Sequence, residues 1–422
     1  MVSRLRIIYS ANKSIAVVFF HFFALLGCYW AMDRFGLITT IPNEKNLLNW
    51  DAYWYDSIRE TGYKFVAGTS CNLAFFPLFP LFWKATALSA FGICCINTFI
   101  FAATITILQW GEKVSGMFLL LIMAMPSLVF NALPYSEAFF FLFGALLIKG
   151  YEQNSTPKKT LGILGASLTK SVSTVFIPAI LLVELFDRNK QAKRYHIDVI
   201  INVCSGLLGT FLVGLLQWHQ TGRWFYFFEV QKYWKRRWIF PRFPLTTYRA
   251  GKVLAFDGIG FSVGLLALAC CLRWFYLLWL KRGEDKLAPN NAVLFSALTL
   301  TATLILDTCF TFNDGGATSI WSINRHLLCS PFTMTFLSWL YNNISKSKLQ
   351  LYISMLIICI CIYLTGVFRF PLMLLYYCLF FSTFIFLRIF PSYRYYLIII
   401  YVASVALQIQ TFYDFLNNKW VG

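Results

Sequence analysis

An aspartate and a proline-bounded aromatic run follow the first long apolar segment of the chain. The aspartate belongs to the stretch NWDAYWYDSIRETGYKF, and the proline-bounded aromatic run is in CNLAFFPLFPLF, a few residues later. Asp51 therefore has aromatic residues on both sides in the sequence. If a helix begins here, Asp51, Tyr55 and Ile58 share one face, while Trp50 and Trp54 form a stripe suited to a membrane interface. A carboxylate held there could take a proton from a hydroxyl group. Aspartate is also a preferred helix N-cap, so a purely structural role stays open.

Further polar residues stand beside apolar runs. Tyr135 and Glu137 occupy a short polar turn before an apolar segment, where the helix dipole alone could account for a glutamate. Lys170 interrupts one apolar segment, and Arg325 and His326 begin another. Because a cation at membrane depth is costly unless it is paired, Lys170 and Arg325 are candidate phosphate ligands.

The elements that must position these residues are membrane helices. The chain has 422 residues, of which 59% are hydrophobic and 13% charged. Apolar runs of roughly 17 to 25 residues recur, each long enough to cross a bilayer as a helix. The net charge of +18 would suggest nucleic acid in a soluble chain, but much of it lies in short loops, as expected of residues that set topology. We expect one all-α polytopic membrane domain over residues 1–422.

The apolar runs predict about 11 to 13 membrane-spanning or re-entrant helices, with amphipathic helices on the outer face. A catalytic outer loop is expected at about 33–78, and one span follows Glu137. The other spans are predicted near residues 14–32, 79–108, 114–131, 199–219, 259–280, 291–312, 326–341, 349–367, 371–388 and 395–412.

The segment 161–186 disturbs the alternation of the loops. Basic residues precede and follow it, and both flanks should lie inside, which a single crossing does not allow. We therefore predict a re-entrant pair of half-helices with Lys170 near its tip and Ser171 beside it, a geometry tolerated where it lines a protein cavity. The helix-weakening residues in the segment are Gly162, Gly165 and Pro178.

Residues 220–258 form a basic, aromatic loop that the topology places outside, against the positive-inside rule. The stretch WFYFFEVQKYWKRRWIFPRFP mixes aromatic and cationic residues. It also contains Gln231 and Trp234. Such a mixture is typical of an interfacial helix that binds lipid headgroups or phosphates. A simple membrane anchor is an equally good interpretation.

Several motifs resemble the GPI mannosyltransferase 2 family (GT-C type, glycosyltransferase family 76). WDAYWYDSIRETGY with NLAFFPLFPL resembles its outer-loop motif, LPYSEAFF its Y-[ST]-E motif, SLTKSVSTV its R-S-N-G stretch, and RHLLCSPF its late R-[YF]-[LI]-L segment. Lys170 stands where the family has arginine, and Val172 and Ser173 replace asparagine and glycine. EVQKYWKRRW and NNKWVG are more similar to bacterial relatives.

This resemblance implies a GT-C-type membrane mannosyltransferase that uses a polyprenyl-phosphate mannose donor, inverts the sugar and employs Asp51 as general base. A bacterial homologue in the cytoplasmic membrane is favoured, with a glycolipid or glycan acceptor. A eukaryotic member would add the α-1,6-linked mannose to a GPI precursor in the endoplasmic reticulum, from dolichyl-phosphate mannose. The implied substrate-binding residues are Tyr135, Glu137, Lys170, Ser171, Gln231, Trp234, Arg325 and His326.

No metal or cofactor site is predicted. The chain has four histidines and no HExxH, paired CxxC, P-loop or Rossmann motif. The expected partners are membrane lipids, the lipid-linked donor and the acceptor, without nucleic acid. The alternative is a polytopic lipid or glycan transporter or flippase, which would favour internal repeats and a midplane site. A structural subunit of a glycan assembly complex would not need Asp51.

Overall fold

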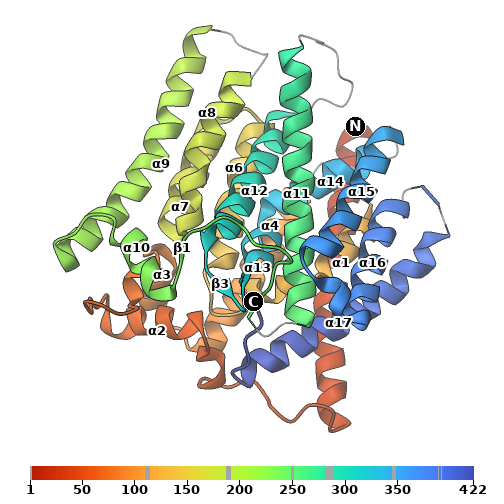
Figure 1. Ribbon diagram of the computed structural model, residues 1–422, viewed down its shortest axis with the longest axis horizontal. Helices are drawn as coiled ribbons and strands as arrows, with labels where there is room; N and C mark the ends of the chain where they lie inside the picture. Colours follow the sequence, from red (N-terminus) through yellow and green to blue (C-terminus); the bar gives the residue numbers. More distant parts are fainter. Residues whose placement is uncertain are drawn as a thin grey trace.

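The architecture is a bundle of helices with two short antiparallel strand pairs (Figure 1). The computed structural model describes residues 2–109, 115–186, 192–248, 251–280, 289–344, 348–387, 389–390 and 392–422. The predicted all-α, membrane-embedded class is confirmed by six helices that are long and apolar enough to cross a bilayer, namely Ser14–Arg34, Ala90–Gln109, Ile197–Thr221, Lys252–Leu277, Asn291–Cys309 and Tyr393–Leu416.

The elements follow one another along the chain with short connections. The helices are α1 Val2–Arg34, α2 Asp51–Thr61, α3 Leu78–Thr86, α4 Ala90–Gln109, α5 Gly116–Met123, α6 Glu137–Glu152, α7 Thr156–Thr169, α8 Phe176–Phe186, α9 Ala192–Thr221, α10 Tyr226–Glu229, α11 Lys252–Trp279, α12 Asn291–Cys309, α13 Ile323–Leu328, α14 Pro331–Asn343, α15 Lys348–Leu364, α16 Pro371–Phe386 and α17 Tyr393–Leu416. Short 3-10 turns are η1 Asn46–Leu48, η2 Asn72–Ala74, η3 Pro126–Asn131, η4 Ser171–Val175, η5 Val230–Trp234 and η7 Val367–Arg369. Strand β1 Arg237–Trp238 pairs with β2 Phe310–Thr311, and β3 Asn313–Asp314 pairs with β4 Ala317–Thr318.

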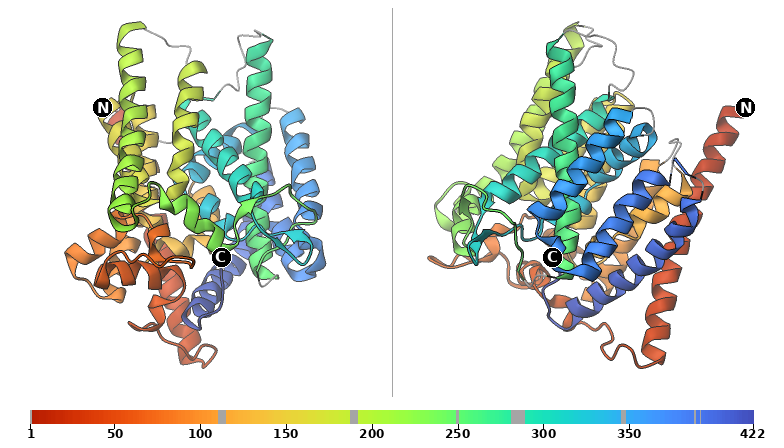
Figure 2. Two further views of the ribbon diagram at one scale, coloured as in Figure 1. Left: turned by 60° about the vertical axis from the view of Figure 1, so that its left-hand side comes forward. Right: turned by 45° about the vertical axis from the view of Figure 1, so that its right-hand side comes forward.

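The short elements gather at one end of the bundle. In Figures 1 and 2 the helices α2, α3 and α10 lie near the C-terminus at this end, while the connected ends of α8 and α9 lie at the other. Helix α2 packs on α3, and Tyr55 contacts the ring of Phe79 with 5.0 Å between centroids. This end therefore brings the predicted outer loops together.

The chain reverses direction at Lys170. Helix α7 stops at Thr169, and Lys170 is extended with φ −153° and ψ 139° before η4 and α8. Gly206 of α9 faces both Ile163 of α7 and Ile177 of α8, so the two helices stand at one level on either side of the break. The geometry agrees with the expected broken segment and tip, while its depth in a membrane stays a prediction.

Three predicted spans are divided, among them 114–131, which forms α5 and η3 rather than one helix. Residues 79–108 form α3 and α4 rather than one helix, because Ala87 takes a left-handed conformation with φ 50°. The predicted span 326–341 is likewise split between α13 and α14, where Ser330 caps the second helix by accepting a hydrogen bond from the Thr333 amide. Three further apolar helices are shorter than a full span, namely Ser171–Leu185, Lys348–Leu364 and Pro371–Phe386, so the total number of crossings stays a prediction.

The helix predicted in the basic aromatic loop is confined to the first part of the loop. Only Tyr226–Trp234 is helical there, in α10 and η5, and the chain then enters β1 and an extended stretch. Pro241 and Pro244 lack the amide hydrogen that a helix needs, which explains the extended course. The loop also ends early, because α11 begins at Lys252. Of the basic residues used in the topology, Arg188, Lys190, Arg249, Lys281, Arg282, Lys346 and Arg388 lie outside the described residues.

A cysteine placed at Asn154, between α6 and α7, and one at Arg237, in β1, should react on opposite sides of the membrane. In the predicted topology the reversing segment at Lys170 returns the chain to its starting side, and α9, which is long and apolar enough to span a bilayer, then crosses once. Labelling with a membrane-impermeant maleimide on sealed vesicles tests this, with the unsubstituted protein reporting the 12 native cysteines. Reaction of both positions from the same side would contradict the predicted topology.

Candidate active site

A cavity of about 160 Å³ lies at the end of the bundle where the short elements gather. Of the nine site residues predicted from the sequence, seven line it, so residues spread over most of the chain do converge. Its polar lining includes Asp51, Lys170, Ser171, Gln231, Arg236, Ser322, Arg325 and His326. Its aromatic walls are Tyr55, Phe75, Phe76, Trp234, Trp321 and Trp420.

Asp51 is the first residue of α2, not its cap. Trp50 holds the cap position with φ 58° and makes no side-chain cap bond, so the N-cap interpretation of Asp51 is wrong. One oxygen of Asp51, Oδ2, lies 2.6 Å from Nη2 of Arg325. The side chain stays 24% exposed, and Oδ1 has no hydrogen-bond partner among the described residues. Arg325 thus fixes the orientation of a carboxylate whose second oxygen can meet a ligand.

Glu137 and Tyr135 do not line this cavity but lie behind it, so their predicted role in substrate binding stays a prediction. Glu137 is buried at the start of α6, with its Oε1 2.8 Å from Nζ of Lys170 and 3.1 Å from Nε of Arg325. Tyr135 is buried and stacks on Phe130, and the Arg325 guanidinium carbon lies 5.3 Å from the Tyr135 ring centre. Glu137 therefore positions both cations from behind, and Tyr135 contacts Arg325.

Arg325 is the central cation of the site. Burial lowers the pKa of its guanidinium, but the carboxylates of Asp51 and Glu137 raise it more strongly, so the pKa lies above its ordinary value. Its Nη1 atom is nevertheless buried without a hydrogen-bond partner among the described residues. An unpaired buried donor costs about 1–3 kcal/mol.

The cavity carries an excess of positive charge. Among its described lining residues, Lys170, Arg236 and Arg325 are cations and Asp51 is the carboxylate. Lys170 Nζ also lies 5.8 Å from the ring centre of Phe140, so an aromatic face supports it on one side. Such a group of cations beside a hydrophobic bundle is suited to a phosphate group.

The remaining predicted residues, Gln231 and Trp234 in η5 and Ser171 in η4, reach the cavity from two separate turns. Gln231 donates from Nε2 to the Phe227 carbonyl at 3.3 Å. The indole of Trp234 lies 6.4 Å from the ring of Phe75. These residues form one wall of the cavity.

The residues at the site that were not predicted from the sequence include Asp307, Arg236, Trp321 and Trp420. Asp307 near the end of α12 binds His326, and Arg236 lies 3.9 Å from the same carboxylate. The ring of Trp420 lies 4.6 Å from that of Trp321. A carboxylate in an apolar run is a signal that could have identified Asp307. Arg236 belongs to a KRR run in which nothing distinguishes one cation from the next. Trp420 belongs to the NNKWVG stretch, whose only signal was the resemblance, and Trp321 carries no local signal.

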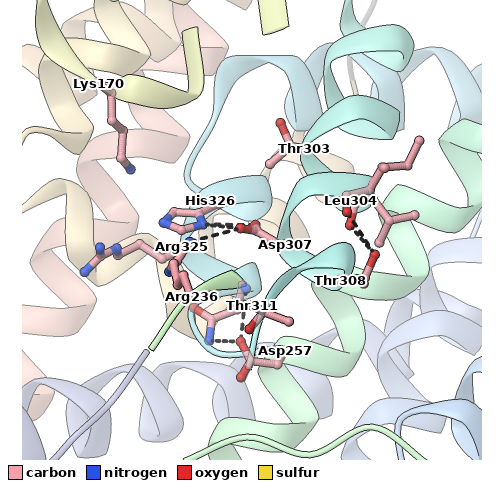
Figure 3. Close-up of polar contacts among 12 residues, drawn as sticks. Lys170, Arg236, Asp257, Thr303, Leu304, Asp307, Thr308, Thr311, Arg325 and His326 are labelled. Carbon is pink, nitrogen blue, oxygen red and sulfur yellow. Dashed lines mark hydrogen bonds and ion pairs between the residues drawn. The ribbon is translucent and has the colours of Figure 1, made fainter. Parts of the chain in front are cut away.

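His326 and Asp307 join α13 to α12. His326 Nδ1 lies 3.0 and 2.9 Å from the two carboxylate oxygens of Asp307. Figure 3 shows Lys170 and the Arg325 guanidinium on the side of the imidazole away from Asp307. The imidazole thus stands between a buried carboxylate and the cationic cavity.

No family model matches this chain, and no curated protein or solved structure matches it either. The resemblance to the GPI mannosyltransferase 2 family therefore stays a hypothesis. In the described ranges no group of three or more His, Cys, Asp or Glu side chains could hold a metal ion. The function must be argued from the chemistry of the cavity.

Proposed function

We propose that the cavity transfers mannose from a polyprenyl-phosphate donor to a hydroxyl group of a glycolipid or glycan, as in a GT-C-type membrane glycosyltransferase. One observation carries the proposal: Asp51 shares a single cavity with Lys170, Arg236 and Arg325 at the end of a membrane bundle. Sugar transfer from a phosphate needs a proton acceptor and cations that balance the leaving group, and this cavity holds both.

Asp51 is the proton acceptor in this proposal. Its unpartnered Oδ1 takes the proton of the acceptor hydroxyl, and the hydroxyl oxygen bonds to the anomeric carbon from the face opposite the phosphate. The bond between that carbon and the phosphate oxygen breaks, and its electron pair leaves with the phosphate. The configuration at the sugar is therefore inverted.

The cations hold the donor phosphate. Arg325 lines the cavity, and Lys170 and Arg236 add positive charge from two other segments. A phosphate on Arg325 competes with Asp51 for the guanidinium, so donor binding weakens the ion pair of 2.6 Å and frees the carboxylate for the proton. The aromatic walls supply flat apolar faces on which a sugar ring can stack.

A lipid or glycan transporter is the second candidate. Transporters place the substrate near the bilayer midplane, at broken helices. The break at Lys170 fits that class, but the cavity lies at the end of the bundle, among the short elements (Figure 1). A site at the end of the bundle meets an acceptor at the membrane surface, which favours the enzyme.

Lys170→Met should raise the KM for the lipid-linked donor and lower kcat/KM roughly tenfold to a hundredfold, because a charge-assisted contact to the phosphate is lost. Lys170→Arg, which keeps the charge, should lose less. Steady-state transfer by the purified protein measures this. Lys232→Met is the matched control, since Lys232 is exposed, pairs with Glu229 and does not line the cavity. If kcat/KM fell equally in the Lys170 and Lys232 variants, Lys170 would not be a phosphate ligand.

A further inference from the structure

The hydrogen bond between His326 and Asp307 has a fixed direction. A carboxylate only accepts hydrogen bonds, so the two contacts of 3.0 and 2.9 Å place the imidazole hydrogen on Nδ1. In the neutral ring Nε2 then carries a lone pair and no hydrogen. Within the part of the chain that the structure describes, Nε2 has no hydrogen-bond partner, and His326 lines the cavity.

The charges around His326 favour this neutral form. Burial lowers the pKa of the imidazole, the nearby cations Lys170 and Arg325 lower it further, and Asp307 opposes them, with the net pKa below the ordinary 6.5. Arg236 lies 3.9 Å from Asp307 and shares its negative charge. Asp51 faces the cavity from α2 but is paired with Arg325. At neutral pH the ring is therefore an acceptor and not a cation.

An acceptor-only nitrogen selects its ligand by chemistry. A fully ionised phosphate oxygen, like that of the donor phosphodiester, has no hydrogen to give it, whereas a hydroxyl group donates well. The cavity thus contains cationic donors suited to phosphate and one acceptor suited to a hydroxyl. A ligand that carries both a phosphate and hydroxyl groups satisfies both sets of atoms.

We propose that His326, oriented by Asp307, binds a hydroxyl group of the sugar on the lipid-linked donor and so distinguishes the sugar-bearing donor from the bare lipid phosphate. This inference rests on the proposed sugar transfer. Asp307 acts through His326 and is a positioning residue. No proton is transferred in this step, since Nε2 only accepts a hydrogen bond.

Equilibrium binding of two probes to the purified full chain tests the inference. The probes are polyprenyl-phosphate mannose and polyprenyl phosphate without sugar. His326→Phe should weaken binding of the mannose-bearing probe roughly threefold to tenfold, as expected for one neutral hydrogen bond, and leave the bare phosphate unchanged. Lys170→Met should weaken both probes. His219→Phe, in the exposed part of α9, is the matched control and should change neither.

Equal loss of both probes in His326→Phe would show a structural or phosphate role and overturn the inference. No loss of either probe would overturn it as well. In both cases a wild-type protein that binds both probes leaves the proposed function standing. If the wild type binds neither probe, the proposed function and this inference are both wrong.

A second variant tests which nitrogen of His326 carries the hydrogen. In Asp307→Asn the amide oxygen can turn to Arg236 and the amide nitrogen to His326, which moves the imidazole hydrogen to Nε2. We expect this variant to weaken the mannose-bearing probe at least as much as His326→Phe. Nitrogen-15 NMR of labelled histidine reports which ring nitrogen carries the hydrogen, with His326→Phe assigning the signal. A hydrogen on Nε2 in the wild type would overturn the inference whatever the binding shows.

Acid should weaken binding of the mannose-bearing probe through the same atom. The pKa of His326 lies below 6.5, so the neutral ring and full affinity persist at neutral pH. As the pH falls through that lowered pKa, Nε2 gains a hydrogen and stops accepting. The mannose-bearing probe is a phosphodiester whose charge does not change in this range, so its affinity should fall in acid by a larger factor in the wild type than in His326→Phe. An equal fall in both proteins would assign the effect to another group.

Discussion

Asp51→Asn should lower the rate of sugar transfer by about a hundredfold to ten-thousandfold, the usual contribution of a general base. The amide keeps the shape of the side chain but cannot accept the proton of the acceptor hydroxyl. Folding should survive, because Arg325 keeps its contact with Glu137. Transfer of labelled sugar by purified protein, alongside its thermal unfolding, measures both properties.

Asp56→Asn is the matched control for this experiment. Asp56 lies on the same helix, pairs with Arg59 at 2.6 Å and does not line the cavity. Its substitution should leave transfer within a small factor of the wild type. Full transfer activity in Asp51→Asn, or an equal loss of activity in Asp56→Asn, would show that Asp51 is not the general base.

Arg325→Met should have the largest effect on stability, lowering the free energy of unfolding by about 3–5 kcal/mol. The guanidinium is buried between two carboxylates, 2.6 Å from Asp51 and 3.1 Å from Glu137. Its removal leaves Asp51 without a cation partner and leaves Glu137 with Lys170 alone. Thermal unfolding of the detergent-solubilised protein measures the loss.

The double variant Arg325→Met with Asp51→Asn separates this charge effect from lost packing. Neutralising Asp51 removes the uncompensated carboxylate, so the double variant should recover about 0.5–3 kcal/mol relative to the sum of the single changes. Strictly additive losses would mean that the ion pair contributes nothing and that Arg325 acts through its packing.

The convergence of the charged residues could be predicted because the membrane restricts their choices. A cation at membrane depth needs a partner, and the charge rule placed Asp51, Glu137 and Arg325 at the same face. The break at Lys170 could be predicted because basic residues flank one apolar segment on both sides. These arguments use only hydrophobicity and charge, which are visible along the chain.

The exact partners could not be predicted, because they depend on how helices distant in sequence pack. Asp51 at the start of α2 and Arg325 in α13 meet only through the packing of the folded bundle. Helix α3 ends where Ala87 takes a left-handed backbone conformation, and an alanine in the sequence does not predict that conformation. Asp307 faces His326 because of the rotation of α12, which an apolar run with little periodicity does not reveal.

The most direct test of the account is product formation from labelled polyprenyl-phosphate mannose, offered to the purified protein with lipids and glycans of its native host. We predict a mannosylated product with inverted anomeric configuration in the wild type and none above background with Asp51→Asn. A folded wild-type protein that forms no product, or that moves the intact donor across vesicles without cleaving it, would contradict the account.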